Sequence, residues 1–208
     1  MLLCMPELPE VETTIRYLDS KVNGKKILSI TTSKKKLRKN LHTTNLSAIE
    51  GSTIISVDRR AKYIVLTLKP LRYLVIHLGM SGRLKFFKKK NYTNEKHDHV
   101  VMEFSQFNVV FNDPRRFGMF FMLEDDRELH NFFQHYGVDL LLDSINYENI
   151  FLIFQKKNVS LKQILLDQRV FVGIGNIYAN EALFHSRLHP ERKSNTLSKV
   201  EIKKLIRS

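Results

Sequence analysis

The stretch KYIVLTL, residues 62–68, decides the fold class, because its apolar and β-branched residues favour a strand that Pro70 ends. Further short strands are expected at residues 73–77, 83–87, 100–104, 109–111 and 119–123. The first two of these flank the turn GMSG, residues 79–82, and the next two form a hairpin around Gln106. Short strands joined by turns between about residues 25 and 123 predict an antiparallel β-sandwich or a barrel.

Helical patterns lie on both sides of the strands. Apolar residues repeat at helical spacing within residues 6–22, and the pattern is helical again in the last third of the chain. An S-x-x-E capping box at 198–201 starts a last helix of only about two turns, so we expect residues 194–208 to fray. The sequence therefore predicts an α+β protein with an N-terminal domain over residues 6–125 and a helical domain over residues 126–208.

The composition favours a polyanionic partner. The chain has 208 residues with 34 Lys and Arg against 21 Asp and Glu, a formal net charge of +13. An excess of this size is typical of proteins that bind nucleic acid. No apolar run approaches the roughly 20 residues of a membrane span. Cys4 is the single cysteine, which excludes an internal disulfide or a zinc site of several thiolates. We expect a basic cytoplasmic protein without a bound metal.

The segment MPELPEVE, residues 5–12, contains a candidate nucleophile. If Met5 is the initiator and is removed, Pro6 becomes a free secondary amine, which can attack a sugar carbon and form an iminium. An α-amino group titrates at about pH 8, so part of it is neutral at physiological pH. Glu7 beside it is placed to shuttle protons. Residues 1–4 oppose this interpretation, because an acylated Pro6 has no nucleophilic amine; an acidic helix start is the alternative.

Six blocks of the sequence resemble, in order, those of bacterial formamidopyrimidine-DNA glycosylases, the bifunctional enzymes that remove oxidised purines. The blocks are MPELPEVET at 5–13, RRAKYI at 59–64, HLGMSG at 77–82, KHDHV at 96–100, DPRRFG at 113–118 and GIGNIYA at 173–179. The resemblance implies a base-excision repair glycosylase with AP lyase activity, which removes 8-oxoguanine and formamidopyrimidines from duplex DNA through a Schiff base. It also implies a catalytic sandwich domain followed by a helix–two-turn–helix DNA-binding domain.

The resemblance implies a catalytic role for three residues. Pro6 is the nucleophile that attacks the anomeric carbon, and Glu7 is the proton donor. Lys62, expected on a strand after an arginine pair, contacts phosphate and assists β-elimination. Without the resemblance, Lys62 would be interpreted as an exposed strand lysine.

A second group of residues is expected to hold the opened duplex. The resemblance implies that the void left by the flipped lesion is filled by Met80, Arg115 and Phe117. The resemblance also implies that four residues contact the DNA: His97, Arg115, Lys157 and Asn176. Asn176 has independent support, because it follows Gly175 at a predicted helix N-terminus, where backbone N–H groups bind phosphate.

The chain departs from the family after the last block. The family continues with further helices and a four-cysteine zinc finger, which are not found within the 208 residues. We therefore expect a truncated helical domain, no zinc or other cofactor in this chain, and a weakened final elimination step. The expected partner is double-stranded damaged DNA, bound by a monomer. Two alternatives stay open: a non-catalytic DNA-binding remnant of such an enzyme, and a cationic protein without a nucleic-acid role.

Overall fold

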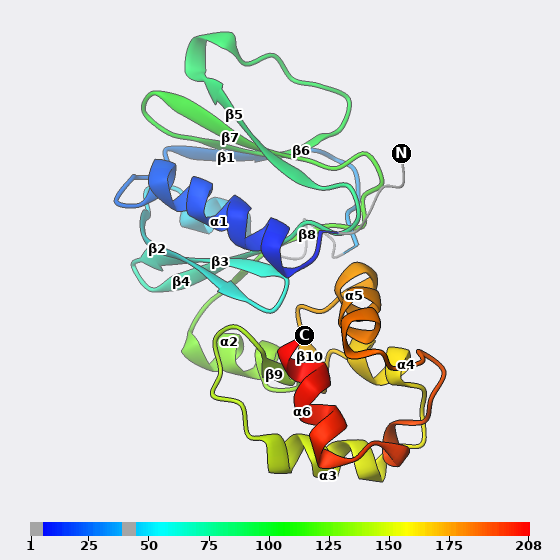
Figure 1. The fold of residues 1–208 in the computed structure, drawn as a ribbon. Coiled ribbons are helices and arrows are strands. Elements are labelled where there is room, and N and C mark those ends of the chain that lie inside the picture. Colours follow the sequence, from blue (N-terminus) through cyan, green and yellow to red (C-terminus); the bar gives the residue numbers. More distant parts are fainter. Residues whose placement is uncertain (1–5, 39–44) are drawn as a thin grey trace. The chain divides into compact units, whose positions relative to one another are not determined.

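The computed structural model describes residues 6–38 and 45–208, and it divides the chain into two compact units, Met1–Phe133 and Gln134–Ser208. The described part of the N-terminal unit is built on two antiparallel sheets and a long helix (Figure 1). One sheet has the strand order β2-β3-β4-β8 and the other the order β1-β6-β7-β5. This confirms the predicted α+β class with an antiparallel sandwich.

The elements of this unit follow the predicted order. Its helices are α1 (Leu8–Val22), η2 (Leu46–Ile49), η3 (Lys89–Asn91) and α2 (Asp126–Phe133). Its strands are β1 (Ser29–Thr32), β2 (Thr53–Arg60), β3 (Tyr63–Lys69), β4 (Arg72–His77), β5 (Arg83–Lys88), β6 (Asp98–Glu103), β7 (Phe107–Asn112) and β8 (Met119–Leu123). The predicted hairpin is the antiparallel pair β6 and β7.

One apolar core joins α1 to both sheets. The α1 stripe predicted from helical spacing is buried, with Leu18 and Val22 fully so. Ile64 and Leu66, two residues apart on β3, belong to the same core, because alternate residues of a strand share a face. The ring of Tyr17 packs edge-on against Phe86 of the other sheet, 4.8 Å between centroids. These contacts fix α1, and with it the position of the residues that precede it.

The helix α2 packs on the outer face of the β2-β3-β4-β8 sheet. The ring centroid of Phe132 lies 5.4 Å from that of Tyr63, and the Tyr73 hydroxyl donates a hydrogen bond to Asp126. That hydrogen bond, together with burial, raises the pKa of the Tyr73 phenol. The N-terminal unit of the structure extends through α2 to Phe133, whereas the sequence predicted a boundary after residue 125.

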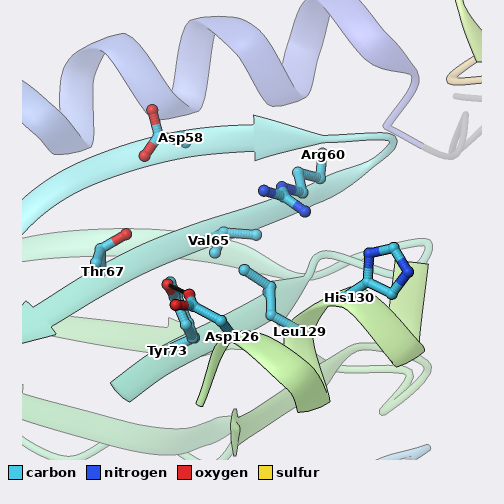
Figure 2. A pocket seen from close by; sticks show the side chains of 8 residues that line it. All are labelled: Asp58, Arg60, Val65, Thr67, Tyr73, Asp126, Leu129 and His130. Carbon is cyan, nitrogen blue, oxygen red and sulfur yellow. Dashed lines mark hydrogen bonds between the residues drawn. The ribbon is translucent and has the colours of Figure 1, made fainter. Parts of the chain in front are cut away.

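The same outer face has an open pocket of about 400 Å³ (Figure 2). It is lined by Asp58, Arg60, Val65, Thr67, Tyr73, Asp126, Leu129 and His130. Both carboxylates already accept hydrogen bonds, Asp58 from Ser56 Oγ at 2.6 Å and Asp126 from Tyr73. The residues predicted for catalysis or DNA binding do not line this pocket.

The C-terminal unit is helical with its own core, as predicted. Its elements are β9 (Val138–Asp139), α3 (Tyr147–Lys156), α4 (Leu161–Leu166), β10 (Phe171–Val172), α5 (Asn176–Ser186), η4 (Ser194–Thr196) and α6 (Lys199–Arg207). Phe154, Leu161, Ile164 and Phe171 are fully buried in that core. Sequence patterns did not reveal the two-residue strands β9 and β10, which pair in parallel.

The last helix, α6, is packed rather than isolated. Ile202 and Leu205 are 1% and 2% exposed in the core formed with α3 and α5. The predicted capping box is present, with the Ser198 hydroxyl accepting from Glu201 N. The expectation that residues 194–208 fray assumed a helix without tertiary contacts, and the structure supplies them. Across residues 6–38 and 45–208, we find no helix long and apolar enough to span a membrane.

Candidate nucleic-acid and catalytic site

Pro6 and Glu7 lie directly before the first turn of α1. Pro6 is half-buried, and Glu7 is 1% exposed as the N-cap residue of the helix. The backbone N–H of Glu7 donates to Glu10 Oε2 at 3.0 Å, so the first turn holds the dipeptide in place. Residues 1–5, which include the segment that would block the Pro6 amine, lie outside the described residues.

Lys62 lies in the turn between β2 and β3, and its predicted place on a strand was wrong. The strand begins one residue later, because Ala61 has a left-handed backbone with φ of 53° and turns the chain. Arg59 stabilises this turn by donating from Nη1 to the Ala61 carbonyl oxygen at 3.2 Å. Lys62 itself is buried at 8% exposure.

An ion pair ties that turn to the start of α1. The Nε of Arg59 lies 3.1 Å from Oε2 of Glu12, and the arginine side chain is 2% exposed. Glu12 lies one turn after Leu8, so the β2–β3 turn and the N-terminal end of α1 meet at one end of the sandwich (Figure 1). The structure therefore brings the three predicted catalytic residues, Pro6, Glu7 and Lys62, to the same end of the unit.

His77 is a further residue of this region, which the sequence analysis quoted in a motif without assigning it a role. Burial, together with the positive charges of Arg38 and Lys62, lowers the pKa of His77 to about 4. Its Nδ1 accepts from the backbone N–H of Gly79 at 3.0 Å, which requires that nitrogen to be unprotonated. The position of His77 in HLGMSG was the available signal. Nothing in the sequence pointed to Arg38, which follows a lysine run.

The predicted void-filling residues lie on two adjacent turns. Met80 is half-buried on the turn after β4, whereas Arg115 and Phe117 are exposed on the turn between β7 and β8. The Arg115 guanidinium lies over the Phe117 ring, 5.2 Å from its centroid. Phe117 keeps 45% of its surface exposed although the guanidinium lies over its ring. The structure thus places the three predicted void-filling residues on neighbouring turns.

A backbone hydrogen bond joins His97 to the turn between β7 and β8. Its carbonyl oxygen accepts from Asp113 N at 3.0 Å, and the Asp113 carbonyl oxygen is bonded to His99 Nε2 at 2.9 Å. Burial lowers the pKa of His99. His97 itself is half-buried, with its side chain on the loop before β6. His97 therefore lies next to the turn that carries Arg115.

In the C-terminal unit, Asn176 is the first residue of α5 and is exposed, with Gly175 as N-cap. The preceding loop is braced by Gln168, which accepts from Gly173 N at 3.1 Å and donates to the Ile174 carbonyl at 3.0 Å. Gly173 has φ of +87°, a conformation that favours glycine. The 11-residue helix α5 consequently presents a positive dipole end at Asn176, as the sequence predicted.

Lys157 is at the end of α3 in a local ion-pair cluster. Its Nζ lies 2.9 Å from Asp167 Oδ2, and Arg169 Nε lies 3.0 Å from Oδ1 of the same carboxylate. Hydrogen bonds from Arg169 and then Lys157 hold the pKa of Asp167 well below its usual range. A phosphate contact by Lys157 would therefore compete with Asp167 for the ammonium group.

Two domain families together match most of the chain. Residues 5–120 match the formamidopyrimidine-DNA glycosylase N-terminal domain, and residues 136–208 match the H2TH domain of the same enzymes. Formamidopyrimidine-DNA glycosylases from Wolbachia pipientis and Rickettsia bellii are 37% and 39% identical over 97% of this chain. The chain spans 74% of each of these relatives.

Solved structures agree with the sequence matches. Lactococcus lactis formamidopyrimidine-DNA glycosylase bound to abasic-site DNA has a TM-score of 0.89 and 30% identity. The alignment covers 97% of this chain and 74% of that one. A complex of the same enzyme with DNA containing a formamidopyrimidine has the same TM-score and identity.

A sandwich unit and a helical H2TH unit, both matching enzymes solved on damaged DNA, define a DNA glycosylase of base-excision repair. More specifically, the chain belongs to the formamidopyrimidine-DNA glycosylase family. This confirms the resemblance expected from the six sequence blocks.

Proposed function

We propose that this DNA glycosylase is bifunctional and removes oxidised purines, 8-oxoguanine and formamidopyrimidines, from duplex DNA through a Schiff base on Pro6, followed by AP lyase cleavage. The observation that carries this proposal is the placement of Pro6 and Glu7 before α1, at the end of the sandwich that also holds the Lys62 turn. A proline at this position is a nucleophile only with a free amine, so the active form is one that begins at Pro6.

The proposed chemistry uses the chain's own groups. The neutral Pro6 nitrogen attacks C1′ while the glycosidic bond breaks, and the base leaves with the bonding electron pair. Opening of the sugar ring yields an iminium, with Glu7 shuttling the proton. Loss of a C2′ proton then expels the 3′ phosphate, which is β-elimination. Lys62 contributes a positive charge near the departing phosphate, where preorganised charge stabilises a developing negative charge.

The proposed DNA contacts come from both units. Met80, Arg115 and Phe117 occupy the gap left by the flipped nucleotide, and Arg115 hydrogen-bonds the orphaned base. His97, Lys157 and Asn176 contact phosphates, which suits the net charge of +13. We also infer that the protein acts as a cytoplasmic monomer on double-stranded DNA.

Borohydride trapping tests the proposed reaction. Protein that begins at Pro6 is incubated with duplex DNA carrying 8-oxoguanine or an abasic site, and sodium borohydride reduces any iminium to a stable adduct. We expect a covalent adduct with both substrates. Pro6→Gly should weaken trapping, and Glu7→Gln should suppress excision of the oxidised base.

Pro9→Ala is the matched control, because Pro9 lies in the first turn of α1 without a reactive amine. It should leave trapping intact. Robust trapping by protein that retains residues 1–5 would show that Pro6 is not the nucleophile. Tight binding of lesion DNA without trapping by either form would instead support the alternative of a non-catalytic DNA-binding protein.

A further inference from the structure

Two turns of the N-terminal unit touch through their backbones. They are turn A, residues 79–82 with sequence GMSG, and turn B, residues 113–118 with sequence DPRRFG. A Cβ on Gly79 would lie 2.5 Å from the Gly118 nitrogen, and Gly79 has φ of +62°. A Cβ on Gly118 would lie 2.9 Å from the His77 carbonyl oxygen. Only glycine allows this approach at either position.

The buried carboxylate of Asp113 hydrogen-bonds to both turns. Its side chain is fully buried, and its Oδ1 accepts from the Ser81 hydroxyl at 2.5 Å. Its Oδ2 accepts from Gly118 N at 2.8 Å. The backbone N–H of Arg115 donates to Ser81 Oγ at 3.1 Å and to Asp113 Oδ1 at 3.2 Å. Hydrogen bonds to a buried carboxylate are stronger than those between neutral groups.

These hydrogen bonds hold the backbone next to each of the three projecting side chains. Met80 lies between Gly79 and Ser81 on turn A, and Arg115 and Phe117 project from turn B. Displacement of either turn would break the Ser81–Asp113 hydrogen bond and leave the buried carboxylate short of a donor. The backbone segments that carry the three side chains are therefore coupled, although Ser81 and Asp113 lie 32 positions apart in the sequence.

We propose that Ser81 and Asp113 are positioning residues that make Met80, Arg115 and Phe117 enter the DNA as one preorganised wedge. This inference rests on the proposed void-filling role of the three side chains. Because hydrogen bonds within the protein already order the two turns before DNA binds, the turns lose no further conformational entropy when the base stack opens. Without the coupling, the two halves of the wedge would enter separately, and stack opening would slow.

The test measures stack opening without requiring catalysis. The probe is a duplex with 2-aminopurine beside a reduced abasic site, whose fluorescence rises when a wedge unstacks it. Ser81→Ala in protein that begins at Pro6, at saturating concentration, should slow this rise by about tenfold, the effect of losing one hydrogen bond to a charged group. Ser81→Thr keeps the hydroxyl and should restore the rate to within about twofold of the parent.

Ser56→Ala is the matched control, because it removes another serine-to-aspartate hydrogen bond, to Asp58, on strand β2 of the same unit. It should leave the fluorescence rate unchanged. Thermal unfolding of each variant reports whether Ser81→Ala still folds, and Asp113→Asn provides a second break of the network. The double variant Ser81→Ala/Phe117→Ala should be slower than Phe117→Ala alone by clearly less than tenfold, since part of the effect of Ser81 passes through Phe117.

Trapping on a single-stranded abasic oligonucleotide separates this inference from the proposed reaction. That substrate has no stack to open, so Ser81→Ala should trap it to within about twofold of the parent, whereas Pro6→Gly should trap it more weakly. Absence of trapping in every form would refute the proposed reaction while the fluorescence rates still report on the wedge. The positioning role would be overturned by a parental fluorescence rate in Ser81→Ala, or by additive losses in the double variant.

Discussion

The Nε of Arg59 lies 3.1 Å from Oε2 of Glu12, so a buried guanidinium connects β2 to α1. The same arginine also donates to the Ala61 carbonyl, where the chain turns toward Lys62. Its side chain is only 2% exposed, so it has been removed from water and depends on these contacts. This one side chain therefore ties the turn that carries Lys62 to the N-terminal part of α1.

Arg59→Ala should therefore lower the free energy of unfolding by about 3 kcal/mol, which urea unfolding would measure. Arg16→Ala is the matched control. Arg16 pairs with the other oxygen of Glu12 at 3.2 Å, but its side chain is 79% exposed. An exposed i, i+4 pair contributes about 0.5 kcal/mol or less. Similar losses in both variants would show that burial of Arg59 is not what makes its pair important.

His77 should remain neutral down to about pH 4, because burial and the charges of Arg38 and Lys62 lower its pKa. In the unfolded chain a histidine titrates at about 6.5. The unfolded state therefore binds more protons between these pH values, and the free energy of unfolding should fall as the pH drops from 6.5 to 4. The full effect is on the order of 3 kcal/mol. Histidine NMR titration would show a midpoint near pH 4.

His77→Asn identifies that resonance and removes the titrating group, while its side-chain oxygen can still accept from Gly79 N. The loss of stability between pH 6.5 and 4 should be smaller in this variant than in the parent. A His77 midpoint near 6.5 in the folded protein would contradict the placement of this side chain between two cationic groups.

The sequence predicted the helices and strands better than it predicted the contacts between them. The α1 stripe was predictable because helical spacing repeats over four turns, and the central strands because their apolar runs are continuous. The Lys62 turn was missed because Ala61 adopts a positive φ that is rare for residues other than glycine. The pairing of Arg59 with Glu12 joins residues 47 positions apart, and no local pattern encodes it.

DNA affinity should depend steeply on salt if the proposed phosphate contacts form. With about four to six phosphates neutralised, the slope of log K against log salt should be about −4 to −5. Lys62→Ala should reduce its magnitude by about one. Lys69→Ala is the matched control, since Lys69 is an exposed lysine at the opposite end of β3. Fluorescence anisotropy at several salt concentrations would measure both, and a slope near zero would contradict the phosphate contacts.

The helix α6 should be protected from hydrogen exchange, because Ile202 and Leu205 are buried against α3 and α5. Glu201 stabilises its first turn by accepting from Ser198 N at 2.9 Å and from Arg192. The hydrogen bonds from Arg192 and Ser198 lower the pKa of Glu201 to about 2. Its contribution is therefore present above pH 4.5 and is lost as the pH falls toward 2.

Glu201→Gln removes the charge that pairs with Arg192 and should increase exchange at the amides of residues 202–206, with a local loss of about 1 kcal/mol. Glu191→Gln is the matched control, because Glu191 is an exposed carboxylate in the loop before α6. Exchange measured at pH 7 by mass spectrometry would compare the two variants with the parent. If the amides of residues 202–206 exchanged at unprotected rates in the parent, the packing of α6 would not stabilise it in solution. Equal exchange in all three proteins would show that the charge of Glu201 and its ion pair with Arg192 contribute nothing to the helix.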